Sequence, residues 1–189
     1  MKKYYERNAT KYIEDTINVD MSGQYNFFMK YLSKKGKLLD IGFGSGRDVI
    51  HFSSLGYDVL GIDIVPDFVN RIKNMGYKAE LLDINDINYR EEFDGIWACA
   101  SLLHIEREKL KKNFVLCSNA LKNNGYMYCS FKYGDYSGFI DGRYFNNVNE
   151  DIIESILINT GLSIVETNKS KDLLERDNEW INIILQIRK

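Results

Sequence analysis

Three glycines at alternate positions, Gly42, Gly44 and Gly46, follow a short apolar run that is typical of a buried strand. A glycine loop between a strand and a helix lets the backbone approach a ligand closely and directs amide groups toward it. Asp40 precedes the glycines, and Asp63 ends the next apolar run, where a carboxylate can accept hydrogen bonds from both hydroxyls of a ribose. Each feature alone is weak. Together, and in this order, they predict a nucleotide-binding site.

These side chains need strands and helices that hold them in place, and from Lys37 onward the chain alternates between the two patterns. Helices are expected from the glycine loop to Leu55, from Pro66 to Gly76, over 106–123, and from a cap at Asn149 to Gly161. Strands are expected at 38–41, 58–63, 78–82, 94–100, 125–132, 162–167 and 180–187. This alternation predicts an α/β fold, a mainly parallel seven-stranded sheet with helices on both faces.

Residues 1–36 precede this pattern and form a separate helical segment of the same structural domain, whose core is 37–189. Ser22 is expected to cap a helix that ends at Gly36, and the Tyr-rich segment 4–20 is expected to be helical in its first half. We expect the apolar stripe from Tyr25 to Leu32 to pack on the sheet.

Length and composition exclude several classes of protein. The 189 residues are 44% hydrophobic, which suits one domain. No run reaches the roughly 18 apolar residues of a membrane span, and the amino-terminal residues lack the apolar region of a signal peptide. The net charge of −2 argues against a nucleic-acid partner. We therefore expect a cytoplasmic protein with no membrane or nucleic-acid partner.

The three cysteines, Cys99, Cys117 and Cys129, lie far apart in apolar surroundings. No pair has the spacing of metal ligands, so the sequence predicts buried, reduced thiols and no metal site.

Three segments carry a family resemblance: 38–48 with the glycine loop, 61–64 with Asp63, and 93–105 with the fourth strand. They resemble the class I S-adenosylmethionine-dependent methyltransferases, and within these the compact small-molecule group that includes tellurite-resistance-type enzymes. The resemblance covers residues 37–189. It implies a Rossmann-like fold, S-adenosylmethionine as cofactor, a small-molecule methyl acceptor and an N-terminal helical lid.

The resemblance also implies positions for the cofactor. The glycine loop would lie along its methionine and ribose, Asp63 would hold the ribose hydroxyls, and Ser101 would approach the methionine end. The residues implied to contact the cofactor are Asp40, Gly42, Phe43, Gly44, Gly46, Asp63, Ile64, Asp83, Ile84 and Ser101. Asp86 is an alternative to Asp83 for the polar contact to adenine.

His104 follows the fourth strand and is the candidate general base, because histidine titrates near neutral pH. The alternative is that His104 only begins the following helix and bonds to its backbone. His51 is expected to be structural. Tyr5, Tyr12, Tyr133 and Arg143 are candidates for contact with the acceptor, and Arg143 would suit an anionic one. Lys132 and Asp135 are interpreted as solvated loop residues, with a place in the lining of an acceptor pocket as the alternative.

Three functions remain open. The first is methyl transfer to a small molecule, and the second is methylation of RNA or protein. The second would favour an Asn-Pro-Pro-Tyr-like tetrapeptide after the fourth strand, where this chain has 100–103, Ala-Ser-Leu-Leu. The third is a non-catalytic module that binds S-adenosylmethionine. An NAD-dependent oxidoreductase is disfavoured, because the loop has the spacing G-x-G-x-G. The dinucleotide fingerprint G-x-G-x-x-G would place its third glycine at position 47, where this chain has Arg47.

Overall fold

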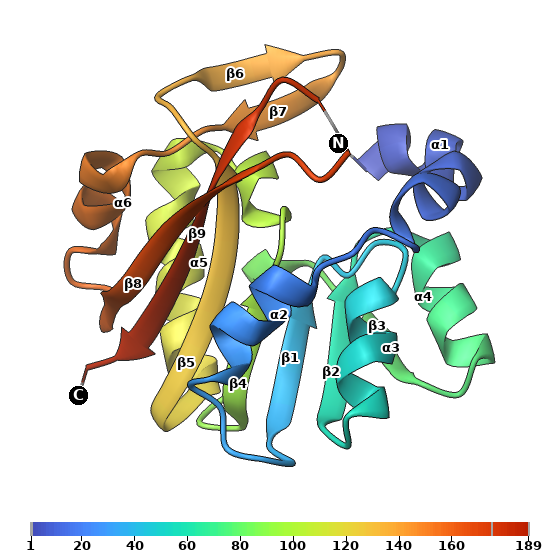
Figure 1. The fold of residues 1–189 in the computed structure, drawn as a ribbon, viewed down its shortest axis with the longest axis horizontal. Helices are drawn as coiled ribbons and strands as arrows, with labels where there is room; N and C mark the ends of the chain where they lie inside the picture. The colour runs from blue at the N-terminus through green and yellow to red at the C-terminus, as the bar shows by residue number, and fades with distance from the viewer. Residues whose placement is uncertain (1, 175, 189) are drawn as a thin grey trace.

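The computed structural model describes residues 2–174 and 176–188. Its centre is a seven-stranded sheet in the order β3-β2-β1-β4-β5-β9-β8 (Figure 1). The strands are β1 (Lys37–Ile41), β2 (Asp58–Asp63), β3 (Lys78–Leu81), β4 (Phe93–Ala98), β5 (Leu121–Lys132), β8 (Leu162–Lys171) and β9 (Glu179–Ile187). The first five are parallel, and β9 runs antiparallel to both β5 and β8. The predicted α/β class and the mainly parallel seven-stranded sheet are confirmed.

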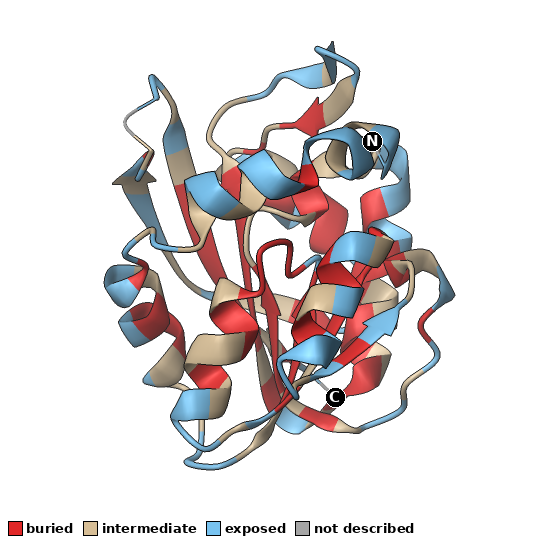
Figure 2. Ribbon diagram, turned by 90° about the vertical axis from the view of Figure 1, so that its right-hand side faces the viewer, coloured by how far each residue is buried: buried red, intermediate tan, exposed pale blue. Residues whose placement is uncertain are grey.

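Helices cover both faces of this sheet. The helices are α1 (Lys2–Thr16), α2 (Ser22–Met29), α3 (Arg47–Ser54), α4 (Pro66–Asn74), α5 (Arg107–Ala120) and α6 (Glu150–Leu157). The apolar sides of α2, α3 and α4 pack on one face, and those of α5 and α6 pack on the other. Figure 2 shows the result, since the strands are mostly buried and the outer sides of the helices are exposed.

Alternation along the strands decides which side chain meets which helix layer. In β4, Trp97 faces the α2 and α3 side, whereas Ile96 faces α5. Trp97 stacks on Tyr128 of β5, with ring centroids 4.0 Å apart, and Phe28 of α2 packs against both rings. Because Phe28 is fully buried in this aromatic cluster, α2 is anchored to the sheet.

Several predicted boundaries are wrong. The helix at Ser22 ends at Met29 rather than at Gly36, and Met21 rather than Ser22 occupies its N-cap position. Met21 has no side chain that could cap, so Asp20 accepts the hydrogen bond from the Ser22 amide instead. The helix over 106–123 ends at Ala120, because β5 pairs with β4 from Leu121 onward.

A hairpin that sequence reasoning missed, β6 (Ser137–Ile140) and β7 (Arg143–Asn146), extends from the sheet (Figure 1). Its strands are only four residues long, and four residues show little periodicity. The expected cap at Asn149 is confirmed, since its side chain accepts a hydrogen bond from the Ile152 amide at 3.0 Å. Two short 3-10 turns, Ile84–Asp86 and Leu102–His104, follow β3 and β4.

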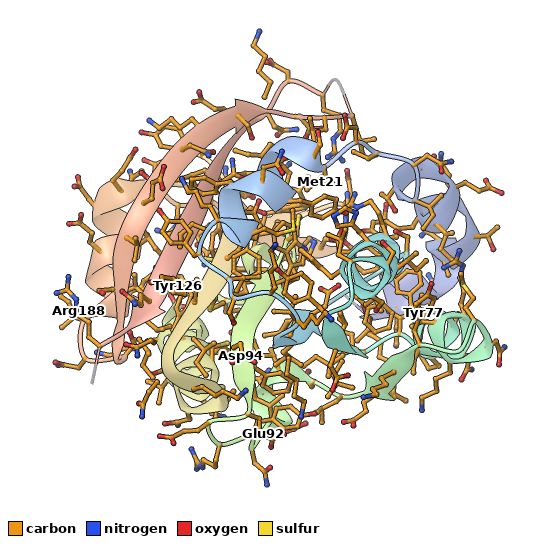
Figure 3. The ribbon with its side chains drawn as sticks, turned by 60° about the horizontal axis from the view of Figure 1, so that its bottom comes forward. Met21, Tyr77, Glu92, Asp94, Tyr126 and Arg188 are labelled. Carbon is orange, nitrogen blue, oxygen red and sulfur yellow. The ribbon has the colours of Figure 1, made fainter. Side chains whose placement is uncertain are left out.

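The two ends of the sheet differ in chemistry. At the amino end of β4, Glu92 and Asp94 pair with Lys37 and Lys122 (Figure 3 labels the two acids). These pairs are partly exposed, so they add little to stability. The glycine loop and the catalytic candidates lie at the carboxyl end, where open α/β sheets bind ligands. Among the described residues, no helix has the length and apolar character to cross a membrane.

Candidate functional site

The glycine loop turns sharply between β1 and α3. Gly42, Gly44 and Gly46 have φ angles of 69°, 53° and 80°, in the region that favours glycine. The turn closes with a hydrogen bond of 2.9 Å from the Gly46 amide to the Phe43 carbonyl. A Cβ on Gly46 would lie 2.0 Å from the side chain of Ile72, so no larger residue fits there. The loop therefore owes its shape to all three glycines.

Asp63 holds this loop from the end of β2. Its carboxylate accepts hydrogen bonds from the Gly44 amide at 3.0 Å and from the Val65 amide at 2.9 Å, one on each oxygen. Burial raises the pKa of Asp63, and these amides oppose that rise. Each carboxylate oxygen has a further lone pair, so Asp63 can still accept from ligand hydroxyls.

Two buried oxygens beside the loop have no hydrogen-bond partner in the described part of the chain: Oδ2 of Asp40 on β1 and Oγ of Ser101 after β4. Ser101 adjoins the loop, because a Cβ on Gly42 would lie 2.7 Å from the Ser101 Cβ. Burial and the charge of Asp48 raise the pKa of Asp40 well above its ordinary value. Buried polar atoms are rarely left unpaired. A ligand with amino and hydroxyl groups at the loop would fit these residues.

Arg47 and Asp48 begin α3 and form an ion pair in which the carboxylate is buried and the guanidinium is partly exposed. The guanidinium donates to Asp48 through Nε at 2.7 Å and Nη2 at 3.0 Å, and the same carboxylate accepts from the Tyr25 hydroxyl and the Trp97 indole. Burial alone would raise the pKa of Asp48, but Arg47 and these two donors lower it. The network joins α2, α3 and β4 directly beneath the site.

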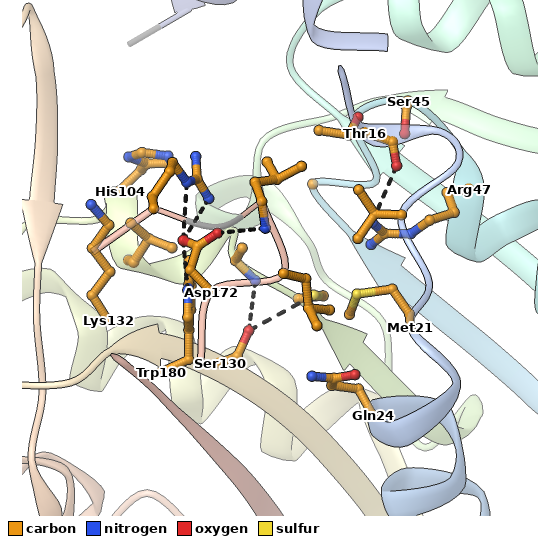
Figure 4. A pocket seen from close by; sticks show the side chains of 18 of the residues that line it. Thr16, Met21, Gln24, Ser45, Arg47, His104, Ser130, Lys132, Asp172 and Trp180 are labelled. Carbon is orange, nitrogen blue, oxygen red and sulfur yellow. Dashed lines mark hydrogen bonds and ion pairs between the residues drawn. The ribbon is translucent and has the colours of Figure 1, made fainter. Parts of the chain in front are cut away.

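A cavity of about 380 Å³ opens next to the glycine loop. Six of the predicted site residues line it: Tyr5, Tyr12, Gly42, Phe43, His104 and Arg143. Figure 4 shows His104, Lys132, Asp172 and Trp180 on one side of the cavity, with Thr16, Ser45 and Arg47 on the other. The cavity therefore extends from the glycine loop, at one end, to the loop between β8 and β9 at the other.

The residues implied to hold the ribose and adenine are not among the described lining of this cavity: Asp63, Ile64, Asp83 and Ile84. Asp83 instead caps the turn that follows it and accepts from both nitrogens of Asn85. Two tyrosines of α1 lie over this side. Tyr12 packs against the Phe68 ring and against Gly44, and burial, with a smaller effect of the Asp63 charge, raises its pKa. The aromatic side of α1 thus covers the ribose end of the predicted site.

His104 is held by two hydrogen bonds that define its tautomer. Its Nδ1 lies 2.7 Å from the Tyr144 carbonyl, which can only accept, so Nδ1 donates. Nε2 then accepts from the Tyr5 hydroxyl at 2.8 Å. Burial, with the positive charges of Arg143 and Lys132, lowers the pKa of His104 to about 4. The imidazole is therefore neutral at pH 7.

Sequence reasoning placed some residues differently. Lys132, interpreted as a solvated loop residue, is half-buried and lines the cavity. Cys99 is half-buried and lines it too, although burial raises its pKa to about 12. Tyr133 is not among the described lining residues, because its hydroxyl donates to Glu150 and its ring contacts Lys169. His51 stacks on Tyr25 at 3.7 Å, in keeping with a structural role.

Other lining residues were missed altogether: Ser130, Asp172, Arg176 and Trp180. They come from β5, β9 and the loop between β8 and β9, far from the glycine loop in sequence. No local pattern marks them. Arg47 and Asp48, in contrast, directly follow the glycine loop and could have been singled out by that position.

Comparisons with known proteins agree with this geometry. A family model described as a methyltransferase domain matches residues 39–129. A probable S-adenosyl-L-methionine-dependent methyltransferase, TehB of Haemophilus influenzae, is 35% identical over 80 residues, which are 39% of this chain and 28% of that protein. An uncharacterized methyltransferase of Schizosaccharomyces pombe is 27% identical over 188 residues, or 94% of this chain and 62% of its own length. The chain thus spans less than two thirds of each of these relatives.

The fold is that of a solved methyltransferase. The 1,6-didemethyltoxoflavin N1-methyltransferase of Burkholderia thailandensis, solved with its substrate and S-adenosylhomocysteine, aligns with a TM-score of 0.81 at 15% identity. The alignment covers 99% of this chain and 85% of that one. The matched family model covers the part of the sheet that carries the glycine loop, Asp63 and Ser101. The chain is therefore similar in sequence to methyltransferase domains over residues 39–129, and it has the fold of solved S-adenosylmethionine-dependent methyltransferases.

Proposed function

We propose that this protein transfers a methyl group from S-adenosylmethionine to a small molecule. One observation carries the proposal: the glycine loop, held by Asp63, lies beside a cavity and beside two buried oxygens that have no hydrogen-bond partner among the described residues. A nucleoside with an amino acid tail offers hydroxyls to Asp63 and an amino group to Asp40. Gly42, Gly44 and Gly46 would let it lie against the backbone, and Ser101 would contact its methionine end.

When bound, the cofactor supplies a methyl group already activated by its sulfonium. The work left to this chain is to orient the acceptor in line with that group and to exclude water, and orientation alone can supply much of a rate. The cavity begins at Gly42 and is lined by aromatic and polar side chains, which suits such an acceptor.

The lid function expected of residues 1–36 would fall to α1. Phe28 anchors α2 in the core, whereas α1 covers Gly44 and Asp63 mainly through the rings of Tyr5 and Tyr12. We infer that α1 moves away to admit the adenosine portion and returns over it. The non-helical backbone at Asn8, with φ −121° and ψ 17°, divides α1 at a point where it could bend.

A small acceptor is favoured over RNA or protein. The cavity is roofed by α1 and bordered by the β8–β9 loop, and its volume of about 380 Å³ falls in the range of small-molecule sites. The protein's net charge of −2 does not favour nucleic acid. We place the reaction in the cytoplasm, because Cys99, Cys117 and Cys129 are all free thiols.

Calorimetric titration tests the proposed cofactor. We expect S-adenosylmethionine and S-adenosylhomocysteine to bind with micromolar dissociation constants and NAD to give no heat, because the loop lacks the dinucleotide spacing. Binding of NAD in preference to both sulfur nucleosides would contradict the proposal. Failure of both nucleosides to bind would leave the fold without this function.

We further propose that His104 acts on the acceptor rather than serving the backbone alone. Its neutral Nε2 lies at the cavity wall, and the Tyr5 hydroxyl that occupies it belongs to the lid. Movement of α1 would free this nitrogen to take a proton. In the closed state the same hydrogen bond holds the lid.

The lowered pKa of His104 predicts a specific acid sensitivity. Between its folded pKa of about 4 and the ordinary value of about 6.5, the unfolded chain binds the extra proton, so acid favours unfolding. We expect protonation of His104 in the unfolded chain to lower the free energy of unfolding by about 2 kcal/mol at pH 5 relative to pH 7.5. Urea unfolding of wild type and His104→Gln at both pH values measures it. Equal losses in the two proteins would show that His104 does not titrate in this range.

A further inference from the structure

The cavity is positively charged, although the protein as a whole has a net charge of −2. Five basic and three acidic side chains are among its described lining residues: Arg47, Lys132, Arg143, Lys171 and Arg176, against Asp48, Asp141 and Asp172. Two of the acids are already engaged. Asp48 pairs with Arg47, and Asp172 accepts from Arg176 at 2.8 Å and from the Trp180 indole at 3.0 Å.

Lys132, Arg143, Lys171 and Asp141 remain, and of these Lys171 and Asp141 are exposed. Lys132 and Arg143 converge on one aromatic ring. Lys132 ends β5 and Arg143 begins β7, yet Lys132 Nζ lies 4.6 Å and Arg143 Cζ lies 5.0 Å from the centroid of the Phe145 ring. The His104 ring lies 5.0 Å from the same centroid. Two cations and the candidate base therefore surround Phe145 at one end of the cavity.

Neither cation has an anionic partner in the part of the chain that the structure describes. No carboxylate of those residues lies within 4.0 Å of Lys132 or Arg143, and the buried Nε of Arg143 has no hydrogen-bond partner among them either. The Arg143 guanidinium is also held over the Tyr4 ring, at 4.3 Å from its centroid. The rings of Tyr4 and Phe145 thus fix the guanidinium while its Nε–H stays unused.

Burial and the basic side chains at this end of the cavity lower the pKa values of Lys132 and His104. Burial lowers the pKa of Lys132, and the charges of Arg176 and Arg143 lower it further. The same two unpaired cations, Lys132 and Arg143, help to lower the pKa of His104. Like charges brought together out of water repel, so a bound anion would stabilise this end of the cavity.

We propose that the methyl acceptor carries an oxyanion group, a carboxylate or a phosphate, that binds between Lys132 and Arg143 beside His104. This inference rests on the proposed function and names the class of its substrate. The planar guanidinium matches the two oxygens of such a group, and the ammonium adds a point charge. Binding the charged group there would place the rest of the acceptor along the cavity toward Gly42.

Three probes of similar size test the charge requirement: benzoate, phenyl phosphate and the neutral benzamide. Each is titrated calorimetrically into protein saturated with S-adenosylhomocysteine, at constant ionic strength. We expect at least one anion to bind at least about tenfold more tightly than benzamide, because charge-assisted hydrogen bonds form only with the anions. The preferred anion distinguishes a carboxylate site from a phosphate site.

Variants locate the site. Lys132→Met and Arg143→Met should each weaken binding of the preferred anion at least about tenfold, and Arg143→Lys should restore part of it. Lys122→Met, at the opposite end of β5 and paired with Asp94, is the matched control and should bind like wild type. Circular dichroism confirms that each variant is folded.

Three results would overturn the inference. The first is benzamide binding as tightly as both anions, and the second is undiminished anion binding in both methionine variants. The third is no binding of either anion at millimolar concentration. The cofactor titration is independent of this outcome, because Lys132 and Arg143 are not among the residues proposed to hold the cofactor. Normal affinity for S-adenosylhomocysteine without anion selectivity would leave the methyltransferase proposal intact. Loss of cofactor binding in wild type would defeat the methyltransferase proposal, and with it the identification of the anion as a methyl acceptor. Anion titrations on the free protein would then test the anion site by itself.

Discussion

Asp63→Ala should weaken the binding of S-adenosylhomocysteine at least about 100-fold, equivalent to about 2.7 kcal/mol. In the proposed complex the carboxylate accepts hydrogen bonds from both ribose hydroxyls, and hydrogen bonds to a charged group are worth about 1.5–3 kcal/mol each. The carboxylate also binds the Gly44 and Val65 amides, so its loss would loosen the loop that contacts the cofactor. Titration calorimetry on both proteins measures the change.

Asp58 provides a matched control for this variant. It begins the same strand, β2, but lies at the opposite end of the sheet, where it is half-exposed and pairs with Lys78. Asp58→Ala should bind S-adenosylhomocysteine with an affinity within about twofold of wild type, because exposed ion pairs contribute little. Wild-type affinity in folded Asp63→Ala protein would refute the ribose assignment.

The second large effect is on stability rather than binding. Asp48→Ala should lower the free energy of unfolding by about 3–5 kcal/mol, because it leaves the Arg47 guanidinium, which is mostly buried, without its partner. The Tyr25 hydroxyl and the Trp97 indole N–H lose their acceptor as well. Urea unfolding at pH 7 measures the loss, and a lower denaturation midpoint at an unchanged slope would assign it to stability.

Asp67 is the control for this comparison. Asp67 lies in the first turn of α4, as Asp48 lies in the first turn of α3, but Asp67 is exposed. Its carboxylate interacts favourably with the positive N-terminal end of the helix dipole. Asp67→Ala should cost less than about 1 kcal/mol. The double variant Arg47→Met, Asp48→Leu should recover much of the loss, since apolar residues can replace a buried pair. If Asp48→Ala were no more destabilising than Asp67→Ala, the buried network would not support the site.

The sequence alone was sufficient to predict the sheet and the loop. Residues adjacent in the chain determine these features: apolar runs make strands, Pro66 opens a helix, and three glycines permit a turn with positive φ angles. Asp63 was identified because its place at a strand end is itself a local pattern. The four-residue strands of the β6–β7 hairpin were missed, since so few residues carry no clear period.

The tertiary structure decided how the site is charged and closed. The Tyr5–His104 hydrogen bond joins residues 99 positions apart, and Trp97 reaches Asp48 across 49 positions. Lys132 and Arg143 meet at Phe145 only because β5 and the hairpin pack together. Burial is the main cause of the lowered pKa values of His104 and Lys132, and burial cannot be deduced from the residues adjacent to them in the sequence. Local patterns determined the glycine loop and the carboxylate beside it, whereas contacts between distant segments determined the charge and the solvent exclusion of the cavity, because both depend on packing.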